Sequence, residues 1–467
     1  MADAWQTAAD IRTGAVSSVE VVTASLALAR DHEVNAFTVL LEEAALAAAA
    51  EADALAARGS DLPLLGVPVS VKDHIWMTGV PATNGSLALR DFVPPEDNVA
   101  VARLRAAGAV IVGKTNNPEF CYRGYTDNLL YGLTRNPWDL GRTPGGSSGG
   151  AGASVAAGMT PLALGTDGGG SIRIPAAFCG VVGHKPTFGA VPKDPGFLGW
   201  KTLSVDGPIA RSVRDAALMM SVIAGPAVED DLTYPGLSAA DLLAAVSEGG
   251  GLRGLRIAWS EDMGGLPVDQ GVRSVFRAAV QVFESLGCTL VEDYPAVPHP
   301  TELWNLIACA EGFVSEGPLL AEFAGQMSEG IPELIEAGRD LSAADYIAAM
   351  HEKASYTRLW GEFFGSYDLL VTPTMQLTAF PVGIQTPEAI DGEPVDPFFD
   401  DWCTSCLSAN LAGLPATSVP AGFADGLPVG LQIMGPRWSD ALTLRGAAAF
   451  ERVVPWKGFV PPRARAG

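Results

Sequence analysis

Residues 165–175 have the sequence GTDGGGSIRIP, and this stretch decides both the fold and the chemistry to be expected. The apolar residues before it, 162–165, predict a short buried strand, and Ser171 opens the helix that follows. The three successive glycines between Asp167 and Ser171 let the backbone aim several N–H groups at one point, as in an anion nest. The oxyanion of acyl transfer is an anion of this kind, although an ordinary glycine turn would have the same sequence.

A second glycine–serine block, GGSSG at residues 145–149, matches the G-x-S-x-G pattern of a nucleophile elbow. That elbow must follow a strand directly, whereas residues 136–144, NPWDLGRTP, predict a loop. An α/β-hydrolase also needs an acidic residue and then a histidine after its serine. The later histidines, His184, His299 and His351, lie in no such motif. The block therefore does not predict an α/β-hydrolase.

Two further motifs suggest a cofactor, and neither has the context that the cofactor requires. Residues 108–115, GAVIVGKT, match the P-loop pattern, but the central AVIV predicts a buried strand whose N–H groups are taken up by a sheet. Cys403 and Cys406 form a lone C-x-x-C without the second pair that a zinc site needs. Six cysteines in so long a chain also predict no disulfide framework. We therefore expect no nucleotide, no metal and no other cofactor.

Lys72 ends a strand-like stretch, residues 67–71, in which valines alternate with other residues. Together with GGSSGG at 145–150 and GGGSIR at 168–173, this lysine completes a pattern that resembles the amidase signature family. Other phrases resemble that family as well: GKTNNPEF at 113–120, NPWD at 136–139, GHKPT at 183–187, NLAGLP at 410–415 and GLQ at 430–432. The resemblance therefore spans nearly the whole chain.

The resemblance implies a set of functional residues, each taken over at its own position. Ser171 would be the nucleophile, Ser147 a proton relay that follows a cis peptide bond, and Lys72 the base. The oxyanion hole would consist of backbone N–H groups: those of Gly168, Gly169, Gly170 and Ser171. Supporting side chains would hold the loops: Ser148, Asp167 and Arg173.

The chemistry of these side chains agrees with the implied roles. A serine hydroxyl is a poor nucleophile and needs a base, and since no histidine is suitably placed, Lys72 is the candidate. Burial lowers the pKa of a lysine and lets the neutral amine accept a proton, although a lone lysine at a strand end is usually solvated. Ser147 can donate to Lys72 while it accepts from Ser171, because one hydroxyl does both.

The fold class that we expect is α/β. Alternating strand and helix patterns predict a central mixed β-sheet covered by helices on both faces, and the resemblance implies that this forms a single α/β/α domain over residues 1–467. The S-x-x-E spacing that starts at Ser17 is a capping box and predicts the start of a helix. We expect the following layout: N-terminal helices at 1–60, a catalytic core at about 61–230, 250–300 and 366–455, and a mainly helical insertion at about 301–365.

Composition and charge limit the classes of partner. The chain has 467 residues, 48% of them hydrophobic and 18% charged, so it can bury a large core. Its formal net charge of −23 disfavours nucleic acid and anionic membranes. The N-terminus lacks a signal-peptide pattern, and no apolar run reaches the roughly 18 residues of a membrane span. We therefore expect a cytoplasmic monomer or homodimer that binds neither nucleic acid nor membrane.

The substrate is the part that the sequence leaves open. Residues 115–135 and 300–400 are fairly apolar and predict a pocket for a medium-sized aryl or alkyl amide, an anilide or a carbamate, a urethane included. Other candidates for the pocket, or simply for the core, are Asn84 and several aromatic residues: Tyr125, Trp138, Trp304, Phe313 and Phe380.

Two rival functions come from other classes. The chain also resembles the amidase subunit of a tRNA-dependent amidotransferase, which works only with partner chains. Against this, residues 203–208 have the sequence LSVDGP where that subunit usually has SSLDQIGP. The second rival is a catalytically dead binding protein, which the complete set of one lysine and two serines disfavours.

Overall fold

The structure is a computed structural model that describes residues 2–247, 251–396 and 401–462. Within these residues, eleven strands form one mixed sheet: β1 (Phe37–Leu40), β2 (Pro68–Lys72), β3 (Val110–Thr115), β4 (Leu162–Asp167), β5 (Val182–Lys185), β6 (Val205–Ala210), β7 (Arg256–Trp259), β8 (Thr289–Glu292), β9 (Leu369–Pro373), β12 (Ala416–Ala424) and β13 (Leu427–Met434). A separate short hairpin pairs β10 (Ala389–Ile390) with β11 (Glu393–Pro394).

The strand order across the sheet is β1-β3-β2-β4-β6-β5-β12-β13-β9-β7-β8. Two parallel groups, β3-β2-β4 and β9-β7-β8, lie on either side of a central antiparallel group. The expected mixed sheet is therefore confirmed.

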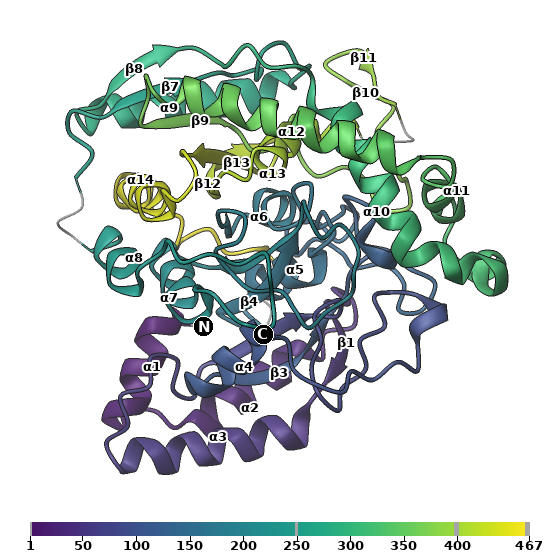
Figure 1. The fold of residues 1–467 in the computed structure, drawn as a ribbon. Helices are drawn as coiled ribbons and strands as arrows, with labels where there is room; N and C mark the ends of the chain where they lie inside the picture. Colours follow the sequence, from purple (N-terminus) through teal and green to yellow (C-terminus); the bar gives the residue numbers. More distant parts are fainter. Residues whose placement is uncertain (1, 248–250, 397–400, 463–467) are drawn as a thin grey trace.

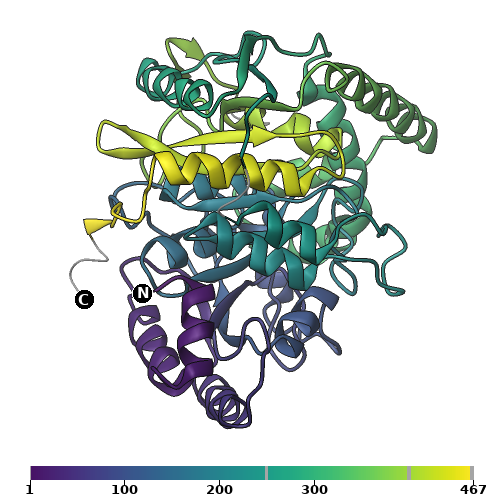
Figure 2. The same ribbon diagram turned by 90° about the vertical axis from the view of Figure 1, so that its left-hand side faces the viewer.

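Helices cover both faces of this sheet (Figures 1 and 2). The described helices are α1 (Ala4–Thr13), α2 (Ser18–Ala29), α3 (Glu42–Ala57), α4 (Val99–Ala106), α5 (Gly149–Ala156), α6 (Arg173–Cys179), α7 (Val213–Ile223), α8 (Ala239–Ala245), α9 (Gln270–Ser285), α10 (Pro300–Phe323), α11 (Ile331–Glu336), α12 (Ala343–Phe363), α13 (Leu407–Leu411) and α14 (Asp440–Val453). At Ser17, both hydrogen bonds of the predicted capping box are present.

The main core lies between one face of the sheet and helices α4, α7, α9 and α14. The opposite face is covered by three groups of helices: α2 and α3 beside β3, α5 and α6 in the centre, and α10 and α12 beside β9. Strand alternation assigns the side chains of β2 to these faces. Val69 and Val71 enter the main core, whereas Ser70 contacts Ser154 of α5 on the other face. Lys72, two residues after Ser70, therefore belongs to the α5 side.

Most predicted elements appear close to their expected positions, but residues 1–60, where only helices are expected, also contain the strand β1. The strands β5 and β6 are likewise not anticipated by the sequence pattern. Their sequences, VGHK and VDGPIA, carry glycine, histidine and proline instead of an apolar alternation. Proline is rare inside a central strand because it cannot donate to the ladder. β6 nevertheless pairs with β4 on one side and β5 on the other. The close approach of β5 requires glycine at position 207, because a Cβ there would lie 2.6 Å from the carbonyl oxygen of His184.

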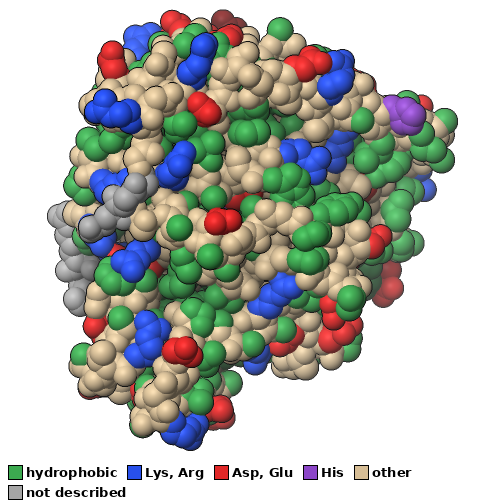
Figure 3. Space-filling view, turned by 60° about the vertical axis from the view of Figure 1, so that its left-hand side comes forward, with side chains coloured by type: hydrophobic (Ala, Val, Ile, Leu, Met, Phe, Trp, Pro, Cys, Tyr) green, Lys and Arg blue, Asp and Glu red, His purple; other side chains and the backbone are tan. Residues whose placement is uncertain are grey.

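The surface shows charges of both signs despite the acidic composition. Acidic and basic side chains are interspersed over the face that Figure 3 views. Within the described ranges, no helix is both long enough and apolar enough to cross a lipid bilayer.

Candidate active site

Lys72 is the last residue of β2 and has no exposed surface. Its Nζ donates to Oγ of Ser147 and to Oγ1 of Thr166, both at 2.7 Å. Burial lowers the pKa of this lysine from its ordinary value, which favours the neutral amine. The solvated strand-end lysine that the sequence left open is therefore absent.

The parallel strands bring this lysine to the glycine-rich turn. β2 and β4 are parallel neighbours, with Val71 opposite Leu164, so both strands end at the same edge of the sheet. Thr166 and Asp167 end β4 where Lys72 ends β2. The carboxyl edge of a parallel sheet is the usual place for ligand sites in α/β folds.

Lys114, the lysine of the P-loop-like motif, is part of β3, as the predicted buried strand requires. Its Nζ donates to the carbonyl oxygens of Asp73 and Ile75, at 3.0 and 2.7 Å. Burial lowers its pKa to about 8. Lys114 therefore secures the turn that follows Lys72. The backbone of β3, Val110–Thr115, pairs with the neighbouring strands of the sheet.

Ser147 lies in the loop before α5 and is 1% exposed. The peptide bond between Gly146 and Ser147 is cis, as the resemblance implies. A side chain at Gly146 could not fit, because a Cβ there would lie 2.4 Å from the carbonyl oxygen of Tyr125. The glycine before Ser147 is thus required by the close approach of the neighbouring loop.

Ser148 ties the two serine segments together. Its Oγ donates to the carbonyl oxygen of Thr166 at 3.1 Å and accepts from the Thr166 N–H at 3.2 Å. Its own N–H donates to the carbonyl oxygen of Ser171, also at 3.2 Å. Ser148 therefore holds the Ser147 loop against both ends of the glycine turn, through its side chain at Thr166 and through its backbone at Ser171.

Ser171 follows the three glycines and is 8% exposed. A Cβ on Gly168 would lie 2.8 Å from the ring of Trp200, and one on Gly169 would lie 2.9 Å from the ring of Trp304. The N–H of Gly170 donates to Oδ1 of Asp167 at 2.8 Å, so it already has an acceptor. Among the described residues, no acceptor contacts the N–H groups of Gly169 and Ser171.

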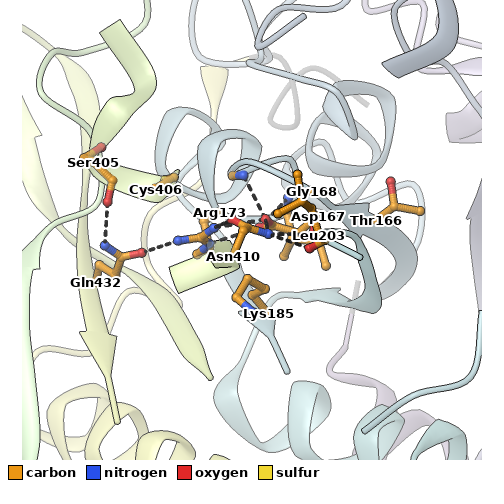
Figure 4. Close-up of polar contacts among 12 residues, drawn as sticks. Thr166, Asp167, Gly168, Arg173, Lys185, Leu203, Ser405, Cys406, Asn410 and Gln432 are labelled. Atoms are coloured by element: carbon orange, nitrogen blue, oxygen red, sulfur yellow. Dashed lines mark hydrogen bonds and ion pairs between the residues drawn. The ribbon is translucent and has the colours of Figure 1, made fainter. Parts of the chain in front are cut away.

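Asp167 and Arg173 form a buried network beneath the glycine turn (Figure 4). Arg173 binds both carboxylate oxygens of Asp167 at 3.0 Å, and it also reaches Oε1 of Gln432 and Oδ1 of Asn410. Burial alone would raise the pKa of Asp167, but the charge and hydrogen bonds of Arg173, with the charge of Lys185 and a hydrogen bond from Asn410, hold it well below its ordinary range. The network keeps the turn in place without touching the solvent.

Two pockets meet at Ser171. One, called here the apolar pocket, has an empty volume of about 630 Å³ and is lined mainly by Ile174, Trp304, Ala308, Leu334 and Leu407, with Arg123 and Asn305 among its polar members. The other, called here the polar pocket, has about 390 Å³ and includes His74, Asn84, Ser204 and Glu316. Ser171 lines both pockets, whereas Ser147 lines only the polar one.

The polar pocket contains residues that the sequence analysis does not single out. His74 follows Lys72 by two residues, a spacing that could have placed it on the same side. Its Nδ1 lies 3.0 Å from Oδ1 of Asn84, and burial above all lowers its pKa to about 4. Cys121 lines both pockets in a left-handed backbone conformation, with φ of 65°, and its thiol contacts the same Asn84 oxygen.

The other pocket candidates separate into lining and core. Trp304 lines the apolar pocket and Asn84 the polar one, while Tyr125, Phe313 and Phe380 pack in hydrophobic clusters. Trp138 borders a different pocket, beside Trp456. The expected specificity ranges 115–135 and 300–400 do contribute residues to the apolar pocket; residues 397–400 of that second range lie outside the described residues. All six cysteines are reduced and buried.

Comparison with known proteins gives one consistent family. The profile of the Amidase family matches residues 20–444. The acylamidase of Rhodococcus erythropolis is 39% identical over 468 residues, which cover 98% of this chain and 96% of that protein. A glutamyl-tRNA(Gln) amidotransferase subunit from Chloroflexus aggregans is 40% identical over 483 residues, covering 98% and 97%. The crystal structure of a bacterial aryl acylamidase of the amidase signature enzymes family superposes with a TM-score of 0.92 at 31% identity, covering 99% of this chain and 98% of that one.

Proposed function

The chain belongs to the amidase signature family of enzymes that act on carbon–nitrogen bonds. On that premise we propose that Ser171 is the nucleophile, Ser147 the proton relay and Lys72 the base. The observation that carries the proposal is the 2.7 Å hydrogen bond between the buried Lys72 amine and Ser147. Ser147 and Ser171 both line the polar pocket, so the proposed relay would run from Ser171 through Ser147 to Lys72.

The first half of the reaction forms an acyl-enzyme, or a carbamoyl-enzyme where a carbamate loses its alcohol. Oγ of Ser171 attacks the carbonyl carbon and passes its proton to Ser147, whose own proton moves to the neutral Lys72 amine. The carbonyl oxygen becomes an oxyanion beside the N–H groups of Gly169 and Ser171, with Gly168 next to them. Gly170 contributes less than its neighbours, because Asp167 already accepts its N–H.

Departure of the leaving amine completes the acyl-enzyme, and hydrolysis in the second half releases the acid. The C–N bond breaks as the leaving nitrogen takes a proton from Ser147, which is replenished from the Lys72 ammonium. Water then attacks the acyl-enzyme and loses its proton along the same relay. Ser171 departs as a hydroxyl, so the enzyme ends as it began. Ser148, Asp167 and Arg173 support these steps through the loops that they hold.

The substrate we propose is a medium-sized aryl or alkyl amide, an anilide or a carbamate such as a urethane. Support comes from the apolar pocket beside Ser171, where Ile174, Trp304 and Leu407 suit an aromatic or aliphatic group. We further propose that the enzyme works in the cytoplasm as a monomer or homodimer, and without a cofactor.

A subunit of an amidotransferase is the second candidate, because one such protein is 40% identical to this chain. The nearly equal identity to an acylamidase, 39%, does not separate the two functions. The overlay with an aryl acylamidase over 99% of the chain favours the hydrolase. Hydrolysis of anilides and carbamates by the purified chain would support the first candidate, and glutaminase activity that needs partner chains would support the second.

The nucleophile is tested by labelling with a fluorophosphonate that reacts with activated serines. Ser171→Ala should lose both labelling and turnover while its circular dichroism stays that of the parent. Ser147→Ala keeps the nucleophile and should label slowly, since only the relay is broken. If Ser171→Ala still labels and Ser147→Ala does not, the roles of the two serines are reversed.

A further inference from the structure

The two pockets can be assigned to the two halves of a substrate, and this step rests on the proposed function. The leaving nitrogen must receive its proton from Ser147, so the amine half has to lie where Ser147 is exposed to the substrate. Ser147 lines the polar pocket and is absent from the wall of the apolar pocket. The acyl half therefore occupies the larger apolar pocket, and the amine half occupies the polar one.

Glu316 is the acidic residue in the lining of the polar pocket. It belongs to α10 and is only 5% exposed. Tyr122 donates to its Oε2 at 3.0 Å and Ser315 donates to its Oε1 at 2.5 Å. A carboxylate offers about four acceptor positions, so these two bonds leave capacity for a ligand. Oε1 of Glu316 also lies close to Gly199, another residue of the pocket wall. A Cβ built on Gly199 would lie 3.3 Å from this oxygen.

The position of Glu316 depends on a glycine one helical turn earlier. Gly312 faces Tyr122 so closely that a Cβ would lie 1.9 Å from the phenol oxygen. Residues four apart share one face of a helix, so the phenol that lies over Gly312 ends beside Glu316. Trp200 also contacts the Tyr122 ring, edge to face, with centroids 5.1 Å apart. The carboxylate is thus fixed by packing in addition to its hydrogen bonds.

Lys72, the neutral base of the proposed mechanism, brings no positive charge to the polar pocket. The lining of this pocket favours a cationic or strongly donating group, because Glu316 is its acidic residue. Its histidine, His74, is neutral at ordinary pH because its pKa is about 4. Burial raises the pKa of Glu316 to about 7, so the carboxyl is ionised in mildly alkaline solution, and a bound cation would favour that form further. Arg123 lines the apolar pocket and not the polar one.

We infer that Glu316 is a specificity-determining residue, which selects amides whose leaving amine carries a second hydrogen-bond donor, above all an ammonium group. The preferred substrates are then N-acyl derivatives of short diamines or amino alcohols with an apolar acyl group. The donor pairs with the Glu316 carboxylate while the amide nitrogen lies beside Ser147. The acyl chain meanwhile packs against Ile174, Trp304 and Leu407.

The experiment compares two amides with the same hexanoyl group and nearly the same shape. One has a 2-aminoethyl group on nitrogen and the other a propyl group, so they differ by an ammonium against a methyl; a 2-hydroxyethyl amide serves as a neutral donor. At pH 8 the wild-type kcat/KM should be about tenfold or more higher for the aminoethyl amide than for the propyl amide. Glu316→Gln should remove most of that preference, mainly through KM.

Two controls separate the subsite from the fold and from the reaction. Glu322→Gln removes the same charge from an exposed position of α10 and should keep the wild-type preference. Binding of the same amides to Ser171→Ala, with and without Glu316→Gln, measures recognition without turnover. Equal binding of both amides, or a preference that survives Glu316→Gln, overturns the subsite and leaves the hydrolase proposal standing. Selective binding without any turnover by the wild-type enzyme supports the subsite and contradicts the hydrolase proposal.

Discussion

Replacing Lys72 with methionine is the sharpest test of the proposed base. Methionine nearly matches the length of the lysine side chain, so Lys72→Met removes the amine without leaving a large cavity. What is lost is the pair of 2.7 Å hydrogen bonds to Ser147 and Thr166 in a site without exposed surface. The variant therefore breaks the relay at its basic end while it leaves Ser171 and the glycine turn intact.

The size of the effect follows from the role of the amine. General-base catalysis contributes roughly 10²–10⁴-fold, which corresponds to about 3–5 kcal/mol of transition-state stabilisation. The loss should fall unevenly on substrates. An amine is a poor leaving group that needs a proton as the C–N bond breaks, whereas an alkoxide departs more readily without one. Amides should thus lose the full factor and matched esters clearly less, which shifts the preference of the enzyme toward esters.

The pH dependence gives a second, independent signature. Burial lowers the pKa of Lys72, and the base acts only when it is neutral, so wild-type activity should rise with pH through that lowered pKa. Lys72→Met should lack this rise. The free energy of unfolding should also rise with pH. Between the lowered pKa of Lys72 and the ordinary value of 10.5, the unfolded chain binds one more proton than the folded chain. Wild-type stability should therefore increase with pH in that window, and the variant should lose the increase.

The assay is kcat/KM for one matched amide and ester pair, measured across pH in both proteins. Lys114→Met is the matched control, because it removes another buried lysine amine that bonds to backbone carbonyls and not to a serine. It should lower the stability and keep the ratio of amide to ester activity. An equal, small loss for amide and ester in Lys72→Met, with an unchanged pH profile, would mean that Lys72 is structural and that another group is the base.

Two more variants test the support of the site. Gly169→Ala should reduce kcat/KM by roughly 10²–10³-fold with the fold kept, because its Cβ would lie 2.9 Å from Trp304 and must displace the N–H groups of the nest; wild-type activity in this variant would argue against an oxyanion site there. Arg173→Met should lower the free energy of unfolding at pH 7 by about 3–5 kcal/mol, since it leaves Asp167 as a buried unpaired carboxylate. The Asp167 pKa is held low in the parent, so the deficit should shrink as acid titration protonates that carboxyl in the variant; a deficit independent of pH would contradict the pairing.

Some features of the site could be found in short windows of sequence. The turn before Ser171 was predictable because three glycines between a strand and a helix have few other uses. The strand character of residues around Lys114 was predictable for the same local reason, since β-branched residues favour a pleated chain. In contrast, β6 carries Gly207 and Pro208, whose local preferences oppose a central strand, and only its neighbours in the sheet overcome them.

By itself, the sequence determined the family, the α/β class and the residues around which catalysis is proposed. The motifs at Lys72, Ser147 and Ser171 each lie in one contiguous segment, so they can be recognised without the fold. Only the tertiary structure decided which residues these segments contact. The 2.7 Å contact of Lys72 with Ser147 joins positions 75 residues apart, and Tyr122 reaches Glu316 across 194 residues. Such contacts depend on strand register and helix packing, which arise from the summed burial of many side chains. No local window contains that information, so the polar pocket becomes visible only in the folded chain.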